Sequence, residues 1–387
     1  MKSNYKRLGN YIQEVNKRDT SKQVTKLLGV SIRKVLMPSI ANIIGTDMST
    51  YKIIKKNQFA YGPVTSRNGD KISVALLDEY DKAIVSQAYT VFEVIDKNEL
   101  LPEYLMMWFR RPEFDRYARF KSHGSAREIF GWEEMCETEL PIPSIEKQKE
   151  VVKEYHILVD RIDLNTKLIA KLEETAQAIY KQWFVDFEFP DKNGKPYKSN
   201  GGAMVESELS DIPKGWEIKK YENVMDFKTG KLNSEDAVIN GKYPFFTCSN
   251  ETYKTNTFSF DTEAVILAGN NASAIYPLKY FVGKFDAYQR TYVIKSKHEN
   301  LSNYQIYFTI KSELENFKGV SSGTATKFLT MGILNNLKIN VANNQIQNKF
   351  YNISSGIFKH LQNLNKEHAF LNILKETLLS KISNVDN

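Results

Sequence analysis

One pattern occurs twice in this sequence, at an offset of about 200 residues, and the chain must therefore hold two similar units. Leu-Pro-Glu-Tyr at 101–104 corresponds to Leu-Ser-Asn-Tyr at 301–304, and Gly-Ser-Ala at 124–126 corresponds to Gly-Thr-Ala at 323–325. Each copy runs on into a long segment with helical periodicity. Since a sequence repeat marks a recurring structural module, we expect two similar globular domains, each followed by a long helix.

Composition limits the class of protein. The chain of 387 residues, 42% hydrophobic and 26% charged, can fold into two or three globular domains. Two cysteines, Cys136 and Cys248, are too few for a disulfide framework and favour a reducing, cytoplasmic location. We find no apolar run long enough to span a membrane, and no signal peptide in residues 1–10. The net charge of +7 is compatible with a nucleic-acid partner without indicating one by itself.

The first copy has the pattern of an α/β (α+β) domain. Short apolar or alternating runs predict strands at 52–61, 73–77 and 88–95, and residues 102–120 predict a helix. On that helix we expect a solvated face formed by Arg110, Arg111, Arg116 and Arg119.

A long helix is predicted to begin after Ser144. Pro-Ile-Pro at 141–143 stops the preceding strand, and the Ser144 side chain can accept a backbone N–H at the start of the helix. Residues of the following segment then recur in steps of four and three, the spacing of a coiled-coil seam. This seam consists of Val151, Tyr155, Leu158, Ile162, Asn165, Ile169, Leu172, Ala176, Ile179 and Trp183. A helix of about forty residues is about 60 Å long and needs a partner helix to cover its seam.

The second copy supplies that partner. Its seam consists of Phe350, Ile357, Leu361, Leu364, Leu371, Leu378 and Ile382, interrupted by Ser354, His368 and Lys375. We expect antiparallel pairing, because it holds the two domains at opposite ends of a rod about an approximate twofold axis, whereas parallel pairing would crowd them. Asn165 lies in the middle of the first seam, where a buried amide can specify register or can have no such role.

Between the first helix and the second domain lies a segment rich in proline and glycine, which we interpret as a linker. If extended, about thirty residues are enough to run the length of the rod. The expected order is a first domain at 1–143, a helix at 144–184, the linker at 185–214, a second domain at 215–341 and a helix at 342–387.

Three sequence stretches carry a resemblance to a known family. They are Ala-Ile-Tyr-Lys-Gln-Trp-Phe-Val-Asp-Phe-Glu-Phe at 178–189, Gly-Gly-Ala-Met-Val-Glu-Ser-Glu-Leu at 201–209 and Ile-Pro-Lys-Gly-Trp at 212–216. Together they resemble the central conserved region of the specificity (S) subunits of type I restriction-modification systems, and the resemblance extends over nearly the whole chain. Pro-Ile-Pro at 141–143 followed by Gln148 resembles the start of that family's first spacer helix. The second copy departs from the family with Asn-Val-Ala at 340–342, which leaves the start of its helix open.

The resemblance implies a function in DNA recognition. Each globular domain would be a target-recognition domain that reads one half of a bipartite double-stranded DNA target, and the antiparallel helices would set the spacing and dock two methyltransferase subunits. Those subunits would use S-adenosylmethionine, restriction subunits can join them, and the chain itself would bind no cofactor and no metal.

The motif content agrees with a chain that is not an enzyme. It has no Asn-Pro-Pro-aromatic or Asp-Pro-Pro-aromatic motif, no P-loop, and no Cys or His cluster with metal spacing. Two alternatives remain open, a stand-alone architectural DNA-binding protein and an enzyme such as the recognition half of a fused restriction methyltransferase.

Candidate DNA-contacting residues are polar or cationic side chains at expected turns, because Lys and Arg bind phosphates, and Arg, Asn and Gln read base edges. In the first domain these are Arg33, Lys34, Tyr61, Ser66, Arg67, Asn68, Gln87 and Arg127. In the second domain they are Lys228, Lys231, Thr247, Ser249, Asn250, Asn270, Asn271, Tyr288, Gln289, Arg290, Thr326 and Lys327. The plain alternative is that these residues belong to ordinary polar loops.

An aromatic cluster marks the end of the first helix, with Trp183, Phe184 and Phe187 as its centre. Such a cluster usually belongs to the core, and it can also form a seat for a methyltransferase subunit, because aromatic side chains anchor interfaces. We expect these residues at the coiled coil or at the partner interface.

Overall fold

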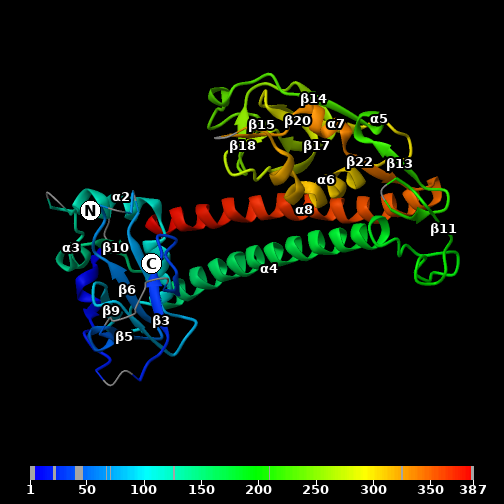
Figure 1. Cartoon of the computed structure of the whole chain (residues 1–387). Coiled ribbons are helices and arrows are strands. Elements are labelled where there is room, and N and C mark those ends of the chain that lie inside the picture. Colours follow the sequence, from blue (N-terminus) through cyan, green and yellow to red (C-terminus); the bar gives the residue numbers. More distant parts are fainter. Residues whose placement is uncertain are drawn as a thin grey trace. The chain divides into compact units, whose positions relative to one another are not determined.

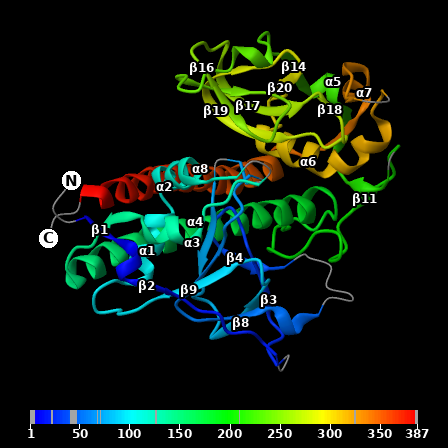
Figure 2. The ribbon, with the colours of Figure 1, turned by 90° about the vertical axis from the view of Figure 1, so that its left-hand side faces the viewer.

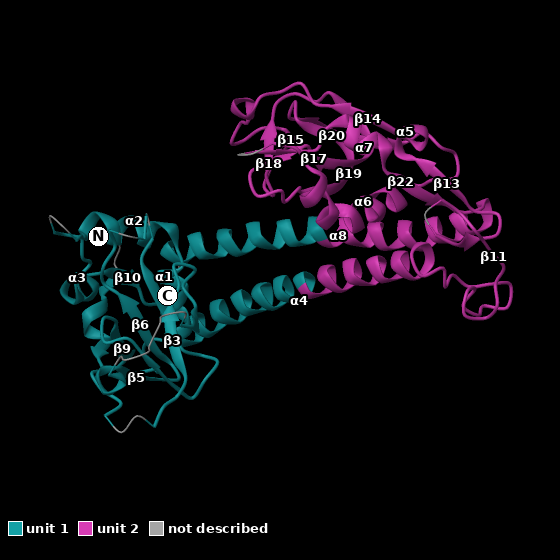
Figure 3. Cartoon of the chain, in the orientation of Figure 1, with its two compact units in different colours: residues 1–166, 365–387 teal, residues 167–364 magenta. Residues whose placement is uncertain are grey.

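The computed structural model describes residues 5–20, 23–39, 47–66, 68–69, 71–124, 127–208, 210–323 and 326–384 (Figure 1). The chain divides into two compact units, residues 1–166 with 365–387, and residues 167–364 (Figure 3). Each unit holds one globular domain of mixed helices and strands together with part of both long helices. The predicted α/β class and the internal repeat are therefore confirmed, although the units divide the long helices instead of taking one each.

The first unit contains two four-stranded sheets, ordered β2-β9-β6-β7 and β4-β3-β8-β5. The strands of this unit are β1 (Tyr5–Arg7), β2 (Ile12–Glu14), β3 (Leu27–Val30), β4 (Leu36–Pro38), β5 (Lys52–Lys55), β6 (Gln58–Gly62), β7 (Ser73–Leu76), β8 (Lys82–Val85), β9 (Thr90–Val94) and β10 (Glu139–Pro141). The apolar run at 52–61 forms two strands, because the chain turns at Asn57, which has a φ of 67°. β6 is one of the two inner strands of its sheet and is buried along most of its length.

The helix predicted at 102–120 is two helices, α1 (Pro102–Phe109) and α2 (Pro112–Lys121), followed by the short α3 (Trp132–Cys136). Pro112 starts the second helix because proline lacks the N–H that would continue the first. Arg111 lies at this break and is only 5% exposed, with its guanidinium 4.3 Å from the centre of the Trp108 ring. The expectation of a solvated position is therefore wrong for Arg111.

The second unit is built on a six-stranded sheet ordered β14-β20-β17-β19-β15-β16. Its strands are β11 (Met204–Val205), β12 (Ile212–Pro213), β13 (Glu217–Lys220), β14 (Met225–Thr229), β15 (Tyr243–Phe246), β16 (Thr252–Thr255), β17 (Phe260–Ala268), β18 (Asn270–Asn271), β19 (Leu278–Ala287), β20 (Thr291–Ser296), β21 (Lys327–Phe328) and β22 (Lys338–Val341). Its shorter helices are α5 (Tyr221–Val224), α6 (Asn303–Val320) and α7 (Met331–Asn336). α6 packs on the six-stranded sheet against β17, β19 and β20 (Figure 2).

The repeat is visible in the strand pairing of the two units. In the first unit β1 pairs antiparallel with β10, and in the second β13 pairs antiparallel with β22. In each case the second strand of the pair leads directly into a long helix. The next pairing also matches, since β2 pairs with β9 and β14 pairs with β20.

The two long helices, α4 (Ile145–Phe184) and α8 (Asn344–Lys381), run antiparallel within each unit. In the first unit Val151 and Tyr155 of α4 share a core cluster with Leu379, near the end of α8. In the second unit Trp183, near the end of α4, lies 6.0 Å from Phe350, near the start of α8, between ring centres. The predicted antiparallel direction is therefore confirmed.

All predicted seam positions are buried or half-buried, and so are the interrupting residues Ser354, His368 and Lys375. The seam prediction missed Phe358 and Leu379, which are both 7% exposed and belong to the cores of their units. Asn165 is 1% exposed, so the polar position in the seam is fully enclosed.

Both helices are capped and fixed at their first turn. The Ser144 hydroxyl accepts the Lys147 N–H at 3.4 Å, and the Asn343 side chain accepts the Ile346 N–H at 3.1 Å. The start of the second helix, left open by the sequence, thus follows Asn343. Gln148 is completely buried, and its amide oxygen accepts the backbone N–H of Leu101 at 2.8 Å, which attaches α4 to the first domain.

The linker is folded at the end of the helices and is not extended along them. In the second unit it turns at Asp191, whose Oδ1 accepts the backbone N–H groups of Asn193 and Lys195, and it then forms the β11–β12 hairpin. The rings of Phe184 and Trp216, which flank the linker, lie 5.4 Å apart. Antiparallel pairing explains this, because it places the end of α4 beside the start of the second domain.

Among the described residues, no helix combines the length and apolar character that crossing a membrane requires.

Candidate nucleic-acid interface

A hairpin carries Arg127 in the first unit. His123 and Ile129 pair antiparallel at its base, and Gly124 has a φ of 133°. A Cβ atom on Gly124 would lie 2.1 Å from the carbonyl oxygen of Arg127, so the hairpin requires glycine at this position. The Arg127 side chain is exposed.

This hairpin lies against the loop that follows β6. Val64 of the loop pairs with Ile129, and the Thr65 N–H donates to the Glu128 carbonyl at 2.9 Å. Within the loop, Asn68 Nδ2 donates to the Val64 carbonyl at 3.1 Å and to Ser73 Oγ at 2.9 Å. The structure thus places the loop with Ser66 and Asn68 next to the hairpin of Arg127.

The second unit repeats this arrangement. Ser322 and Phe328 pair antiparallel, Gly323 has a φ of 100°, and a Cβ atom there would lie 2.2 Å from the Thr326 carbonyl oxygen. The hairpin lies against the segment that follows β17, since Asn270 pairs with Phe328 in the β18–β21 ladder. Thr326, Lys327, Asn270 and Asn271 are therefore neighbours, as their counterparts are in the first unit.

The loop at 288–290 lies next to the hairpin of the second unit. Its Arg290 carbonyl accepts the Gly269 N–H at 2.8 Å, and its guanidinium lies 5.2 Å from the centre of the Phe328 ring. Cys248, in the loop with Thr247, Ser249 and Asn250, also contacts the Arg290 carbonyl, at 3.4 Å.

The segment that follows β14 is held against the same loop. Gln289 donates its backbone N–H to Leu232 at 3.0 Å and its side-chain amide to Asn233 Oδ1 at 3.0 Å. Lys231 precedes this contact in the chain, and Lys228 projects from β14 with its side chain 67% exposed. The structure thus links the loops that carry the candidates of the second domain, although they are far apart in the sequence.

Two candidates of the first domain lie in its interior. Tyr61 is fully buried in β6. Lys34 is 5% exposed and pairs with Asp115 at 2.7 Å, and burial lowers the pKa of its ammonium group. Their burial does not fit the prediction of a DNA contact for these two residues.

The remaining candidates of the first domain differ in position. Arg33 and Gln87 are exposed in separate turns, and no hydrogen bond between described residues joins either to the Arg127 hairpin. Arg67 lies outside the described residues.

Two lysines that sequence patterns do not single out lie near Arg33. Lys71 and Lys375 line a groove of about 630 Å³ in the first unit together with Arg33, Arg110 and Arg116. In the sequence Lys375 is recognisable only as an interruption of the helix seam, and Lys71 lies just after a turn. The cationic side chains face acidic ones in the same groove, Glu113, Asp115 and Glu376.

Among the described residues, no cluster of three or more His, Cys, Asp or Glu side chains has the arrangement of a metal site.

A protein-family model matches residues 36–174 and 213–371, and it is described as "Type I restriction modification DNA specificity domain". The chain belongs to this family. The two matched segments correspond to the two copies of the repeat, so the expected membership in the type I specificity subunits is confirmed.

Type I specificity subunits of several organisms are similar to this chain. The MjaIX specificity subunit of Methanocaldococcus jannaschii is 24% identical over 308 residues, which cover 75% of this chain and 70% of the relative. The EcoDI specificity subunit of Escherichia coli is 30% identical over 128 residues, which cover 33% of this chain and 28% of the relative. The crystal structure of the type I S subunit from M. genitalium matches with a TM-score of 0.62 and 15% identity, covering 99% of this chain and 96% of that one. At that identity the match shows the fold alone.

Proposed function

We propose that each globular domain of this type I specificity subunit binds one half of a bipartite double-stranded DNA target. The observation that carries the proposal is the repeated hairpin, which in each unit combines an obligatory glycine, a cationic residue and a neighbouring polar loop. Arg127 and Lys327 are the cations, and such side chains contact phosphates or guanine edges. On one face of B-DNA, two half-sites lie about 10 base pairs, or one helical turn, apart.

We further propose that the long helices set the spacing of the half-sites and dock two methyltransferase subunits. Exposed apolar side chains outside the seam support this second role. In the first unit they are Ile157 and Leu164 on α4, and Phe370, Ile373 and Leu374 on α8. Their spacing of seven residues on α4 and of three and four on α8 puts them on one face of each helix, and apolar faces of this kind occur at interfaces.

In this proposal the chain performs no chemistry. S-adenosylmethionine is bound by the methyltransferase subunits, and restriction subunits join the same complex. The aromatic residues Trp183, Phe184 and Phe187 are at most 5% exposed, so their burial favours a role in the core over a role as the partner's seat. The proposed seat is the exposed apolar face of the helices.

A methylation assay tests the proposal. The purified chain together with its methyltransferase subunit should modify DNA at one split motif, and neither protein alone should do so. Arg127→Ala should weaken binding to DNA by about 1–3 kcal/mol if Arg127 reads a guanine, and Lys327→Ala should act on the other half of the motif. Weak binding without sequence preference, and no modification with the methyltransferase present, would favour the stand-alone architectural protein.

A further inference from the structure

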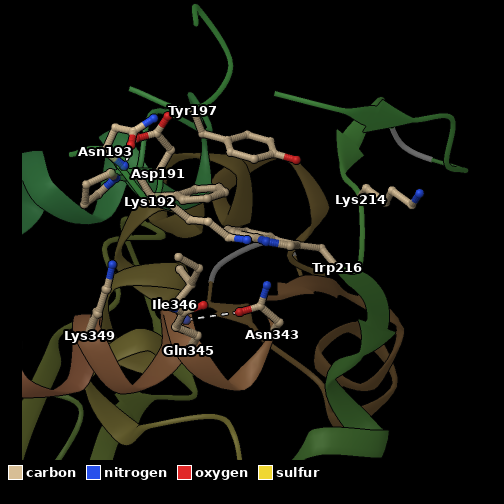
Figure 4. A pocket seen from close by; sticks show the side chains of 12 residues that line it. Asp191, Lys192, Asn193, Tyr197, Lys214, Trp216, Asn343, Gln345, Ile346 and Lys349 are labelled. Atoms are coloured by element: carbon tan, nitrogen blue, oxygen red, sulfur yellow. Dashed lines mark hydrogen bonds between the residues drawn. The ribbon is translucent and has the colours of Figure 1, made fainter. Parts of the chain in front are cut away.

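A cavity of about 400 Å³ opens in the second unit, where the linker meets the first turn of α8 (Figure 4). Its polar lining includes Lys192 of the linker, Lys214 and Trp216 just before β13, and Asn343, Gln345 and Lys349 at the start of α8. The proposed function of this chain leaves the cavity without a role.

Trp216 carries an unused hydrogen-bond donor in this cavity. The residue is 5% exposed, and its indole is stacked on Phe189 with 5.2 Å between ring centres. Its Nε1 has no hydrogen-bond partner among the described residues, although a buried indole N–H normally has one. Figure 4 shows the indole nitrogen between the linker side chains and the first turn of α8.

The charges around this donor are mainly positive. Lys192, Lys214 and Lys349 line the cavity, and none of them forms an ion pair with a described residue. The one acidic residue of the lining, Asp191, already accepts backbone N–H groups of its own turn. The hydrogen bond from the Lys195 N–H is the largest cause of the lowered pKa of the Asp191 carboxyl. The N-terminus of the 38-residue helix α8 adds the positive end of its dipole.

We infer that the cavity receives a carboxylate side chain from an acidic segment of the partner methyltransferase subunit. This inference rests on the proposed function. A carboxylate complements the lysines, the helix N-terminus and the indole N–H together, because all of them favour a negatively charged acceptor. The stacked rings of Phe189 and Tyr197, 4.6 Å apart, offer an apolar wall for the methylene groups of such a side chain.

The position of the cavity favours a protein occupant over DNA. In the second unit, the linker and β11 lie at the opposite end of the globular domain from β18, which belongs to the proposed DNA surface (Figure 1). A single carboxylate on a protein segment can enter a recess of this size, whereas contacts to the DNA backbone extend over a broad surface.

The test is the affinity of the full-length chain for its methyltransferase subunit, measured by titration calorimetry. The double variant Lys192→Glu/Lys349→Glu should weaken binding about tenfold or more, since it replaces attraction by repulsion. Trp216→Phe keeps the stacked ring, removes the N–H and should weaken binding about threefold to tenfold. Lys198→Glu is the matched control, because Lys198 is exposed in the same linker outside the cavity and its variant should bind like the unaltered chain.

Three results would overturn the inference. Unchanged affinity of the cavity variants, while the unaltered chain binds its partner, would reject the cavity and leave the proposed function intact. Weaker binding of the variants to DNA alone, with unchanged affinity for the methyltransferase, would assign the cavity to a phosphate group instead. Failure of the unaltered chain to bind the methyltransferase would reject both the inference and the docking role.

Discussion

Arg161 of α4 and Glu367 of α8 form an ion pair in the first unit, with 2.7 Å between Arg161 Nε and Glu367 Oε1. Arg161 lowers the pKa of the Glu367 carboxyl through its hydrogen bond and its positive charge. Arg161 belongs to the first half of its helix and Glu367 to the second half of the other. The pair therefore reports both the antiparallel direction and the register of the helices.

A charge exchange tests this register. Arg161→Glu should lower the melting temperature of the full chain, because two carboxylates then face each other, and Arg161→Glu/Glu367→Arg should restore most of the loss. The loss should be small at high salt, where exposed charges are screened. A double variant that melts no higher than Arg161→Glu would show that the two positions are not paired in solution.

At Asn165, a substitution is expected to raise the stability of the chain. The residue is 1% exposed, and its Nδ2 has no hydrogen-bond partner of ordinary geometry among the described residues. Asn165→Leu should stabilise the chain by about 1–2 kcal/mol, because it removes the cost of an unsatisfied buried donor. Chemical denaturation measures the change.

A control separates this effect from a general gain in apolar surface. Thr166→Leu adds a leucine at the neighbouring, exposed position of α4 and should change stability by less than about 0.5 kcal/mol. If Asn165→Leu destabilised the chain, the amide would have a partner in solution that specifies the register of the helices.

The long helices could be predicted from the sequence because their packing is local and periodic. Steps of four and three place Leu158, Leu361 and their equivalents on one face of each helix, independently of how the globular domains fold. The seam spacing does not predict Phe358 and Leu379, because each lies one position beyond a strict seam residue and is buried by its globular domain.

The interior of the domains could not be predicted in the same way. As a cation in a turn, Lys34 is expected at the surface from the sequence. Only the fold shows that Asp115, far away in the sequence, compensates its burial. The candidate DNA loops could be selected by residue type. That they meet at the same hairpin in both units depends on long-range pairing, such as that between Val64 and Ile129.

The hairpin glycines should be sensitive to a single methyl group. Gly124→Ala would bring its Cβ against the Arg127 carbonyl, so we expect a loss of about 1–3 kcal/mol in stability or a rearranged hairpin. DNA affinity should fall only for substrates with an intact first half-site, as measured by competition binding. Gly323→Ala should have the same effect on the second half-site.

Gly319→Ala is the control for these variants. A Cβ atom at this helical position has nothing within 4 Å, so the variant should be neutral or slightly stabilising and should bind DNA normally. Equal loss of affinity for both half-sites in Gly124→Ala would contradict independent reading by the two domains.

The helix seam should not tolerate a charge. Leu361 is 7% exposed, and Leu361→Asp should destabilise the helix pair by about 3 kcal/mol or more, because an unpaired carboxylate would be buried there. Lys359→Asp, at an exposed position of the same helix, is the matched control. Circular dichroism during urea unfolding distinguishes them, and equal midpoints for the two variants would contradict the seam.

Modular reading of a split DNA sequence is the central claim, and exchange of one domain tests it most directly. Residues 1–143 are replaced by the corresponding domain of another type I specificity subunit, and the modified motif is read by sequencing methylated DNA from cells that also contain the methyltransferase. The account predicts that one half of the motif changes while the other half and the spacing stay the same. A change in both halves, or modification of the original motif by the exchanged protein, would contradict it.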